Sequence, residues 1–267
     1  MLAAGLGTRM RAEADPRLTA AQQAAAGKGL KGMIPVVAER PFLDFVLSGL
    51  ADAGCRAACL VIGAGEAHQP IRARYGGPGR PTRLELHFAV QRWPLGTADA
   101  VLAAERFAAG EPALVLNADN LYPTAALRTL RELPRAGLLG FRRSTLVAQG
   151  NIPAERIAAF APLEVDGEDC LTRIVEKPDP EELASFGADP LISMNAWLLP
   201  PTIYAACRAV RPSPRGELEL VDAVRHSMAA LGERYRVIES REGVLDLSRP
   251  ADIAEVAARL RDVAVRL

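Results

Sequence analysis

Short apolar runs alternate with longer amphipathic segments along the first half of the chain. The apolar runs end at glycine or polar residues, as buried strands do, and they span residues 58–62, 84–91, 113–116 and 138–141. The segments between them carry apolar side chains three and four positions apart, which predicts helices over residues 42–53, 97–109 and 122–133. This alternation predicts an α/β fold, a three-layer sandwich in which helices cover both faces of a mostly parallel, twisted sheet.

The alternation of strand-like and helix-like segments changes in the second half, where residues 144–200 are richer in strand-like runs. Three such runs lie at residues 162–165, 171–176 and 191–199, and the polar sequence at residues 166–169 predicts a hairpin turn between the first two. We expect these runs to form a small, partly antiparallel lid. Residues 251–267 place apolar side chains on one side of a helix, which predicts a C-terminal helix.

The charge balance argues against two classes of partner. The chain has 267 residues, with 32 lysines and arginines against 32 aspartates and glutamates, so its formal net charge is zero. A neutral chain has no bulk electrostatic attraction for nucleic acid or for an anionic membrane surface. No apolar run reaches the roughly 18 residues that a membrane span needs, and we expect no signal peptide.

The cysteines and histidines form no motif. The four cysteines lack a C-x-x-C pair and a nearby histidine, which argues against a zinc site and favours a reducing, cytoplasmic location; they are Cys55, Cys59, Cys170 and Cys207. The three histidines are scattered, and we expect packing or surface roles for them; they are His68, His87 and His226.

The first informative segment is L-A-A-G-L-G-T-R-M at residues 2–10, in which an apolar stub runs into two glycines. Glycines at the end of a strand let backbone N–H groups approach phosphate oxygens, and Arg9 offers a planar fork of donors to the same anion. We call residues 2–9 the phosphate loop. A tight turn without a ligand is the alternative. Met10 stands where a dinucleotide fingerprint has its third glycine, and no Gly-Lys-Ser/Thr of a P-loop follows.

Six segments, in order, resemble the sugar-1-phosphate nucleotidyltransferases, the pyrophosphorylases that make nucleotide sugars. They are the phosphate-loop sequence at 2–10, K-G-M-I-P-V at 31–36, Q-R-W-P-L-G-T-A at 91–98, L-N-A-D at 116–119, V-E-K-P at 175–178 and R-G-E-L-E-L-V-D at 215–222. The resemblance implies a Rossmann-like fold of the nucleotide-diphospho-sugar transferase type. It also implies one domain over residues 1–267, with a nucleotide-binding half (1–143), a sugar-phosphate-binding half (144–250) and a C-terminal helix (251–267).

The resemblance assigns the charged residues to phosphate groups and a metal ion. Arg9 and Lys31 would face the β- and γ-phosphates of an NTP, and Lys177 would hold the sugar phosphate. Asp119 and Asp222 would bind Mg²⁺, a hard ion that prefers carboxylate and phosphate oxygens. Without the resemblance, the two lysines would be taken for solvated loop residues and Asp222 for a surface charge on a helix. Asp119 closes a strongly apolar strand, where a carboxylate is more often a ligand.

The resemblance also assigns residues to the base and the sugar. Nucleotide binding would involve Leu2, Ala3, Ala4, Gly5, Gly7, Thr8, Gln91, Gly96 and Thr97. Glu176 and Asn195 would hydrogen-bond sugar hydroxyls, although simple strand-end hydrogen bonding would also explain Asn195 and Gln91. Asp246 resembles a late D-x-G-T-P element, and we expect it to make a contact at the start of the following helix.

The implied reaction joins an NTP, with UTP or dTTP favoured through Gln91, to a sugar-1-phosphate. The attacking phosphate already carries nearly two negative charges at neutral pH, so the reaction needs cations and positioned donors and no general base. The alternatives are a non-catalytic nucleotide-sugar-binding or regulatory subunit on the same scaffold and, less favoured, a nicotinamide dehydrogenase. A homo-oligomer is possible. The segment at residues 10–30 is longer and richer in alanine than is usual in this family, and Leu30 replaces the proline before the lysine. These differences predict a different loop over the triphosphate.

Overall fold

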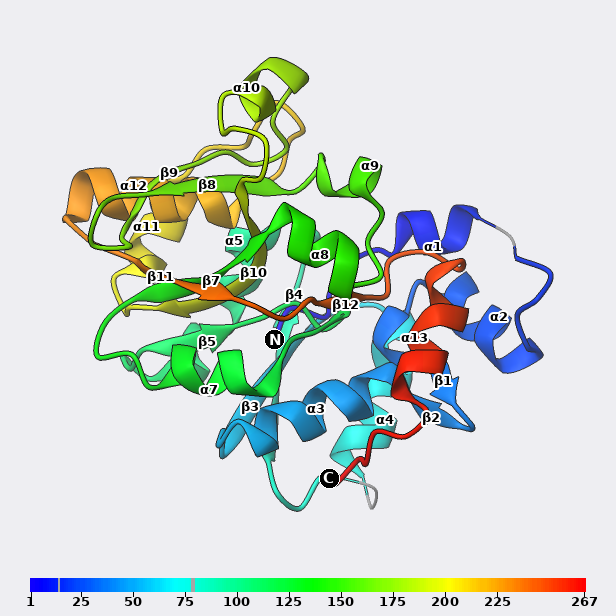
Figure 1. The fold of residues 1–267 in the computed structure, drawn as a ribbon. Coiled ribbons are helices and arrows are strands. Elements are labelled where there is room, and N and C mark those ends of the chain that lie inside the picture. Colours follow the sequence, from blue (N-terminus) through cyan, green and yellow to red (C-terminus); the bar gives the residue numbers. More distant parts are fainter. Residues whose placement is uncertain (14, 78–79) are drawn as a thin grey trace. The chain divides into compact units, whose positions relative to one another are not determined.

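The chain folds into two compact units in the computed structural model, which describes residues 1–13, 15–77 and 80–267 (Figure 1). Unit 1 comprises Met1–Pro94, Asn117–Thr124 and Leu245–Leu267. Unit 2 comprises Leu95–Leu116 and Ala125–Val244. Because each unit is assembled from separate segments, its core depends on contacts between residues far apart in the sequence.

Unit 1 is built around two parallel strands, β3 (Ala57–Gly63) and β4 (Glu85–Gln91). The first residues of the chain lie beside β3, because Leu2 bridges in parallel to Val61 and to Asn117. Backbone hydrogen bonds from Val61 N–H to the Met1 carbonyl (2.9 Å) and from Ala3 N–H to the Val61 carbonyl (2.8 Å) hold this stretch in place. The phosphate loop therefore starts inside the sheet and leaves it where parallel strands end, which is the usual edge for ligand sites.

Short elements complete unit 1. They are α1 (Thr8–Ala12), α2 (Ala20–Gly27), η1 (Lys31–Met33), β1 (Pro35–Val37), β2 (Arg40–Pro41), α3 (Phe42–Asp52), η2 (Glu66–His68), α4 (Gln69–Gly76), β6 (Asn120–Leu121), β12 (Leu245–Asp246) and α13 (Asp252–Leu260). Helix α3 is buried along most of its length. Its one fully buried carboxylate, Asp44, accepts hydrogen bonds from Arg74 (2.6 Å) and from the Tyr75 hydroxyl (2.7 Å) of α4. A buried charge is tolerated when it is paired in this way.

Unit 2 contains a six-stranded mixed sheet. Its order is β11–β7–β10–β8–β9, with β5 pairing β10 as well. The strands are β5 (Ala113–Val115), β7 (Gly137–Arg142), β8 (Ala161–Val165), β9 (Leu171–Ile174), β10 (Leu191–Leu199) and β11 (Arg236–Ser240). The β7–β11 pair is parallel, and the other pairs are antiparallel. The long strand β10 pairs with three others, so it organises the sheet.

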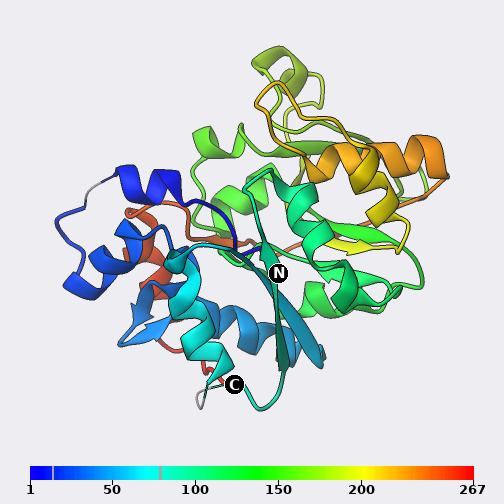
Figure 2. The same cartoon turned by 180° about the vertical axis from the view of Figure 1, so that it is seen from behind.

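The helices of unit 2 are short, and α5, α11 and α12 pack against one another (Figure 2). They are α5 (Thr97–Ala103), α6 (Glu105–Ala108), α7 (Thr124–Arg131, starting in unit 1), α8 (Arg143–Gln149), α9 (Ala154–Ile157), α10 (Pro180–Ala184), α11 (Ile203–Ala209) and α12 (Leu220–Leu231). Within the described ranges, none of the helices is both long enough and apolar enough to pass through a membrane.

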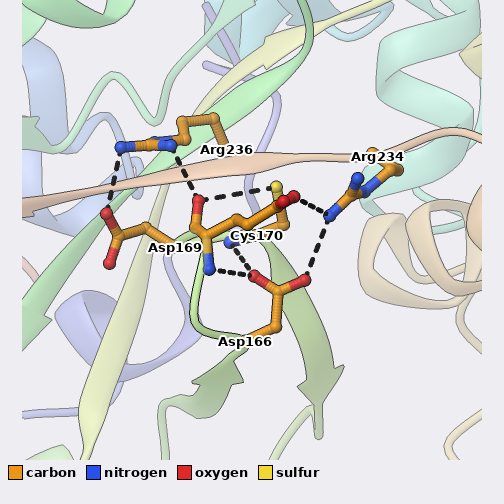
Figure 3. A network of polar contacts seen from close by, with 6 residues as sticks. Asp166, Asp169, Cys170, Arg234 and Arg236 are labelled. Carbon is orange, nitrogen blue, oxygen red and sulfur yellow. Dashed lines mark hydrogen bonds and ion pairs between the residues drawn. The ribbon is translucent and has the colours of Figure 1, made fainter.

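The predicted hairpin turn over residues 166–169 is confirmed between β8 and β9 (Figure 3). The Asp166 carboxylate accepts N–H groups of Glu168 and Cys170 at 2.9 Å each, which lowers the pKa of Asp166. Ligand atoms of Asp166, Glu168 and Cys170 lie within 4.8 Å of one another, as a metal site would require. Arg234 nevertheless bonds to both carboxylates, at 3.1 and 2.9 Å, so part of their negative charge is neutralised within the protein. The cluster stabilises the turn.

The α/β class is confirmed, and three details differ from the sequence-based expectation. The sheet of unit 2 is mixed, since most of its pairs are antiparallel. The helix expected over residues 97–109 breaks at Ala104 into α5 and α6. The C-terminal helix ends at Leu260, with Arg261 as its C-cap, although apolar residues continue to Leu267. Beyond it the chain is irregular, and the Arg266 N–H donates to the Ser48 hydroxyl of α3 at 3.0 Å.

Candidate functional site

The phosphate loop of unit 1 is held by a close backbone crossing at Gly7 and Gly29. Gly7 caps α1 with a φ of 58°, in the left-handed region that favours glycine. A Cβ atom on Gly7 would lie 2.5 Å from the Gly29 carbonyl oxygen, and one on Gly29 would lie 2.5 Å from the Leu6 carbonyl oxygen. The two backbones are therefore in contact. This contact ties the phosphate loop to the segment that leads to Lys31.

Gly29→Ala is expected to destabilise the protein, because its Cβ would press on the Leu6 backbone and its φ of 71° is strained for alanine. A cost of about 1–3 kcal/mol corresponds to a melting temperature lowered by about 3–10 °C. Gly27→Ala is the matched control, since a Cβ there would meet no atom within 4 Å. Differential scanning fluorimetry measures both. Equal melting temperatures for the two variants would contradict the crossing.

Lys31 and Asp119 form the central ion pair of unit 1. The Lys31 Nζ lies 2.7 Å from Asp119 Oδ2, and both side chains are 23% exposed. Burial lowers the pKa of Lys31, but the Asp119 carboxylate, with a smaller contribution from Asp246, outweighs burial and raises the pKa. The nearby positive charge of Arg9 opposes this increase. Lys31 is therefore a charged ammonium that solvent and an anion can still reach, next to the phosphate loop.

A buried polar network fixes the turn that carries Asp119. Asp246 Oδ2 accepts hydrogen bonds from Asn120 Nδ2 and from the Ser248 hydroxyl, both at 2.9 Å. The Leu247 N–H donates to the Asp119 backbone carbonyl at 2.9 Å. Asn120 and Asp246 are 2% and 3% exposed, so these bonds form away from water and hold the turn firmly. The bonds of Asp246 thus go to Asn120 and to Ser248, which precedes the following helix, and Asp246 also adds negative charge near Lys31.

Gln91 ends β4 in unit 1, opposite Gly63 of β3 in the parallel register. Only 6% of Gln91 is exposed. A primary amide presents both donors and an acceptor, so it can recognise the edge of a base. In the structure Gln91 lies at the carboxyl end of its strand, as the sequence predicts.

In unit 2, Gly96 and Thr97 bind to the R-G-E-L-E-L-V-D segment. Gly96 has a φ of 123°, and a Cβ there would lie 2.5 Å from the Leu218 carbonyl oxygen. The Leu218 carbonyl accepts the Ala98 N–H at 2.9 Å, and the Thr97 hydroxyl accepts the Leu220 N–H at 2.8 Å. The Thr97 side chain therefore secures the start of α12 in this structure, a role that its spacing alone did not indicate.

The second charged cluster belongs to unit 2 and centres on Glu176. Burial raises the pKa of Glu176 to about 7, Glu219 adds to the increase, and Lys177 and Arg215 oppose it. Arg215 donates to Glu219 Oε1 at 2.5 Å, and Glu219 is 5% exposed. Asp222, in the first turn of α12, also contributes to the pKa of Glu176. The structure thus brings together Glu176, Lys177 and Asp222, and it adds Arg215 and Glu219.

Two residues of unit 2 have strained backbones: one that the resemblance assigns to the phosphate of the sugar-1-phosphate and one that it assigns to the sugar hydroxyls. Lys177 has a φ of 49° and Asn195 a φ of 58°, which are left-handed values that cost energy for residues other than glycine. The register of β10 shifts between Ser193 and Trp197, so Asn195 sits in a bulge. Its Oδ1 accepts the Trp197 indole N–H at 3.2 Å. Bulges and strained residues are common at functional sites because they re-aim side chains.

Glu176→Gln is expected to remove a pH dependence of stability. Because the folded pKa is raised from 4.5 to about 7, the neutral carboxyl stabilises the fold at low pH, and this contribution is lost as pH rises through 7. Wild type should lose about 1–3 kcal/mol relative to the variant between pH 5 and 8. Urea titrations at both pH values measure the difference. Glu181→Gln, at an exposed position, is the control, and its free energy of unfolding should change with pH as that of wild type does. The same change in Glu176→Gln would refute the raised pKa.

The family described as "Nucleotidyl transferase" matches residues 1–263. The chain belongs to the nucleotidyl transferase family. This nucleotidyl transferase is 28% identical over 239 residues to a glucose-1-phosphate thymidylyltransferase of Streptomyces antibioticus, covering 85% of the chain and 56% of that protein. It is 24% identical to the UTP–glucose-1-phosphate uridylyltransferase YngB of Bacillus subtilis, covering 99% of the chain and 94% of YngB.

A solved structure of UDP-glucose pyrophosphorylase complexed with UDP-glucose shares the fold of this nucleotidyl transferase. The TM-score is 0.71 at 18% identity, covering 97% of the chain and 96% of that structure. The chain spans 56% to 59% of the length of several thymidylyl- and nucleotidyltransferase relatives.

Sequence reasoning missed three residues that contact the candidate site residues of one unit or the other in this nucleotidyl transferase. Arg215 and Glu219 lie in a quoted motif, and their i,i+4 spacing was the available signal for an ion pair. His68 was expected to have a packing or surface role. Its half-buried ring contacts Gly63 and hydrogen-bonds to the backbone of Ala3; burial lowers the pKa of His68, and this bond opposes the decrease. The histidine thereby supports the start of the phosphate loop, a contact that no local pattern reveals.

Proposed function

We propose that this nucleotidyl transferase forms an NDP-sugar and pyrophosphate from an NTP and a sugar-1-phosphate. The observation that carries the proposal is the Lys31–Asp119 ion pair at 2.7 Å, with Arg9 close enough to affect the pKa of Lys31. A phosphate loop, two cations and a carboxylate in one unit match the needs of a triphosphate and its counter-ion. The relatives named above, which act on glucose-1-phosphate according to their names, support the same reaction class.

In the proposed reaction, a phosphate oxygen of the sugar-1-phosphate attacks the α-phosphorus of the NTP. The bond from the α-phosphorus to the oxygen bridging to the β-phosphorus breaks, and pyrophosphate leaves with the electron pair. The nucleophile is already an anion, so no residue has to remove a proton. Arg9 and Lys31 neutralise charge on the β- and γ-phosphates as pyrophosphate departs, and backbone N–H groups of residues 5–8 orient the nucleotide.

Unit 2 supplies the residues proposed for the sugar phosphate. The exposed Lys177 binds the phosphate, and its left-handed backbone fixes the direction in which the side chain leaves the chain. Glu176 and Asn195 hydrogen-bond sugar hydroxyls. With a pKa of about 7, the Glu176 carboxyl can either donate or accept a hydrogen bond at neutral pH.

Asp119 and Asp222 are the proposed ligands of Mg²⁺. The donors fit a hard cation, since both are carboxylates and their side chains are 23% and 35% exposed. When bound, Mg²⁺ supplies charge neutralisation and orientation for the phosphate groups. Asp119 is kept in place for this role by the buried network around Asp246 and Asn120.

The test is a matrix of UTP, dTTP, ATP, CTP and GTP against several sugar-1-phosphates, with released pyrophosphate measured enzymatically. We expect UTP or dTTP with glucose-1-phosphate to react, because the amide of Gln91 suits a pyrimidine edge and the relatives are uridylyl- and thymidylyltransferases. Nucleotide-sugar binding without pyrophosphate release from any pair would instead establish the alternative, a non-catalytic binding or regulatory subunit.

A further inference from the structure

The chain uses lysine very rarely. It has 29 arginines and three lysines, Lys28, Lys31 and Lys177. Arginine and lysine are not interchangeable, because the guanidinium is a planar fork whereas the ammonium is a compact point charge on a flexible stem that can turn toward a phosphate. Two of the three lysines occupy positions proposed to bind phosphate groups. The third, Lys28, has no role in the reaction described above.

Lys28 lies next to the phosphate loop. It is the residue directly before Gly29, whose backbone touches Gly7, and it precedes Lys31 by three positions. The lysine ammonium sits on a flexible four-carbon stem, so it can turn toward an anion bound nearby. Lys28 is exposed, and across residues 1–13, 15–77 and 80–267 it forms no ion pair. Its charge is therefore available to a ligand.

The helix before Lys28 is anchored, so its end has a defined position. Thr19 and Gln22 form a capping box at the start of α2. The Gln22 side-chain amide also donates to the Pro35 carbonyl at 2.9 Å. Lys28 is the C-cap of α2, where a cation interacts favourably with the helix dipole. An arginine would serve the dipole equally well, so capping alone does not explain a lysine in a chain that otherwise uses arginine.

We propose that Lys28 is a further nucleotide-binding residue, which contacts the terminal phosphates of the NTP together with Arg9 and Lys31. This inference rests on the proposed function, because it concerns the same triphosphate. It also gives a role to the Ala-rich segment between the phosphate loop and Lys31. This segment contains α2, whose end places a third cation next to the loop.

The test compares binding of NTP, the matching NMP and inorganic pyrophosphate to wild type, Lys28→Ala and Arg40→Ala, by calorimetry with Mg²⁺. Arg40 is an exposed cation of the same unit that forms no ion pair among the described residues, so it controls for loss of charge. Lys28→Ala should bind NTP and pyrophosphate about tenfold more weakly while its NMP affinity stays within twofold of wild type. Arg40→Ala should match wild type for all three ligands.

Two results would overturn the inference: unchanged NTP affinity in Lys28→Ala, or an equal loss for NTP and NMP. If wild type binds NTP and turns over while Lys28→Ala matches it, the proposed function stands and only the role of Lys28 falls. If wild type binds no NTP, both fall together. Reductive methylation gives a second readout, because mass spectrometry can resolve all three lysines. Pyrophosphate with Mg²⁺ should slow methylation of Lys28, and an unchanged rate would contradict the contact.

Discussion

Asp119→Asn is expected to lower kcat by at least about 100-fold. The substitution keeps the size of the side chain but removes the charge that pairs with Lys31 at 2.7 Å and that we propose binds Mg²⁺. Both losses weaken the stabilisation of negative charge on the phosphate groups as pyrophosphate leaves. Initial-rate measurements at saturating NTP and sugar-1-phosphate determine kcat.

Asp262→Asn is the control for Asp119→Asn, since Asp262 is an exposed carboxylate of the same unit near the C-terminus. It should retain the wild-type rate. Raising the Mg²⁺ concentration should restore only a small part of the activity of Asp119→Asn, because the asparagine is a neutral and weaker ligand. Full activity of Asp119→Asn at ordinary Mg²⁺ concentration would show that the ion pair lies outside the reacting centre.

Lys177→Ala is expected to lower kcat/KM for the sugar-1-phosphate by about 100-fold while leaving KM for the NTP within about twofold. The ammonium is assigned to the sugar phosphate alone, so the two substrates should respond differently. Steady-state kinetics with each substrate varied in turn provides the comparison.

Backbone strain at Lys177 calls for a second variant. Its φ of 49° is unfavourable for alanine as well as for lysine, whereas glycine adopts it freely. Lys177→Gly should therefore lose as much activity as Lys177→Ala while unfolding at the same temperature as wild type or higher. If Lys177→Gly were active and Lys177→Ala inactive, the backbone at this position would matter and the ammonium would not.

Local sequence patterns predicted a helix or strand well where the hydrophobic pattern of one segment determines its structure. Strand β3 follows an apolar run, β4 follows an alternation of apolar and polar residues, and α3 follows amphipathic spacing. The pairing of β10 with β5, β7 and β8 could not be predicted in the same way, because it joins residues that are far apart in the sequence. The local pattern also did not predict the break at Ala104. At the irregular end of the chain, the bond from the Arg266 N–H to Ser48 shows a tertiary contact in place of continued helix.

The site was predictable to the extent that its residues stand in recognisable motifs. Lys31 and Asp119 were identified separately, and only the fold shows that residues 88 positions apart form an ion pair. Asp246 was expected at the start of a helix, yet its bonds to Asn120 arise from pairing of β6 with β12 across 126 positions. The division of the chain into a nucleotide half ending at residue 143 and a sugar half stays a prediction, as does binding of each substrate by its assigned residues.

The most direct measurement follows the phosphorus atoms in a single reaction by ³¹P NMR. Sugar-1-phosphate carrying ¹⁸O on its phosphoryl oxygens would be mixed with unlabelled UTP or dTTP and Mg²⁺. Attack by the sugar phosphate on the α-phosphorus predicts that all ¹⁸O stays on the β-phosphorus of the NDP-sugar, with unlabelled pyrophosphate in equal amount. Label in the pyrophosphate, or orthophosphate in place of an NDP-sugar, would contradict the account.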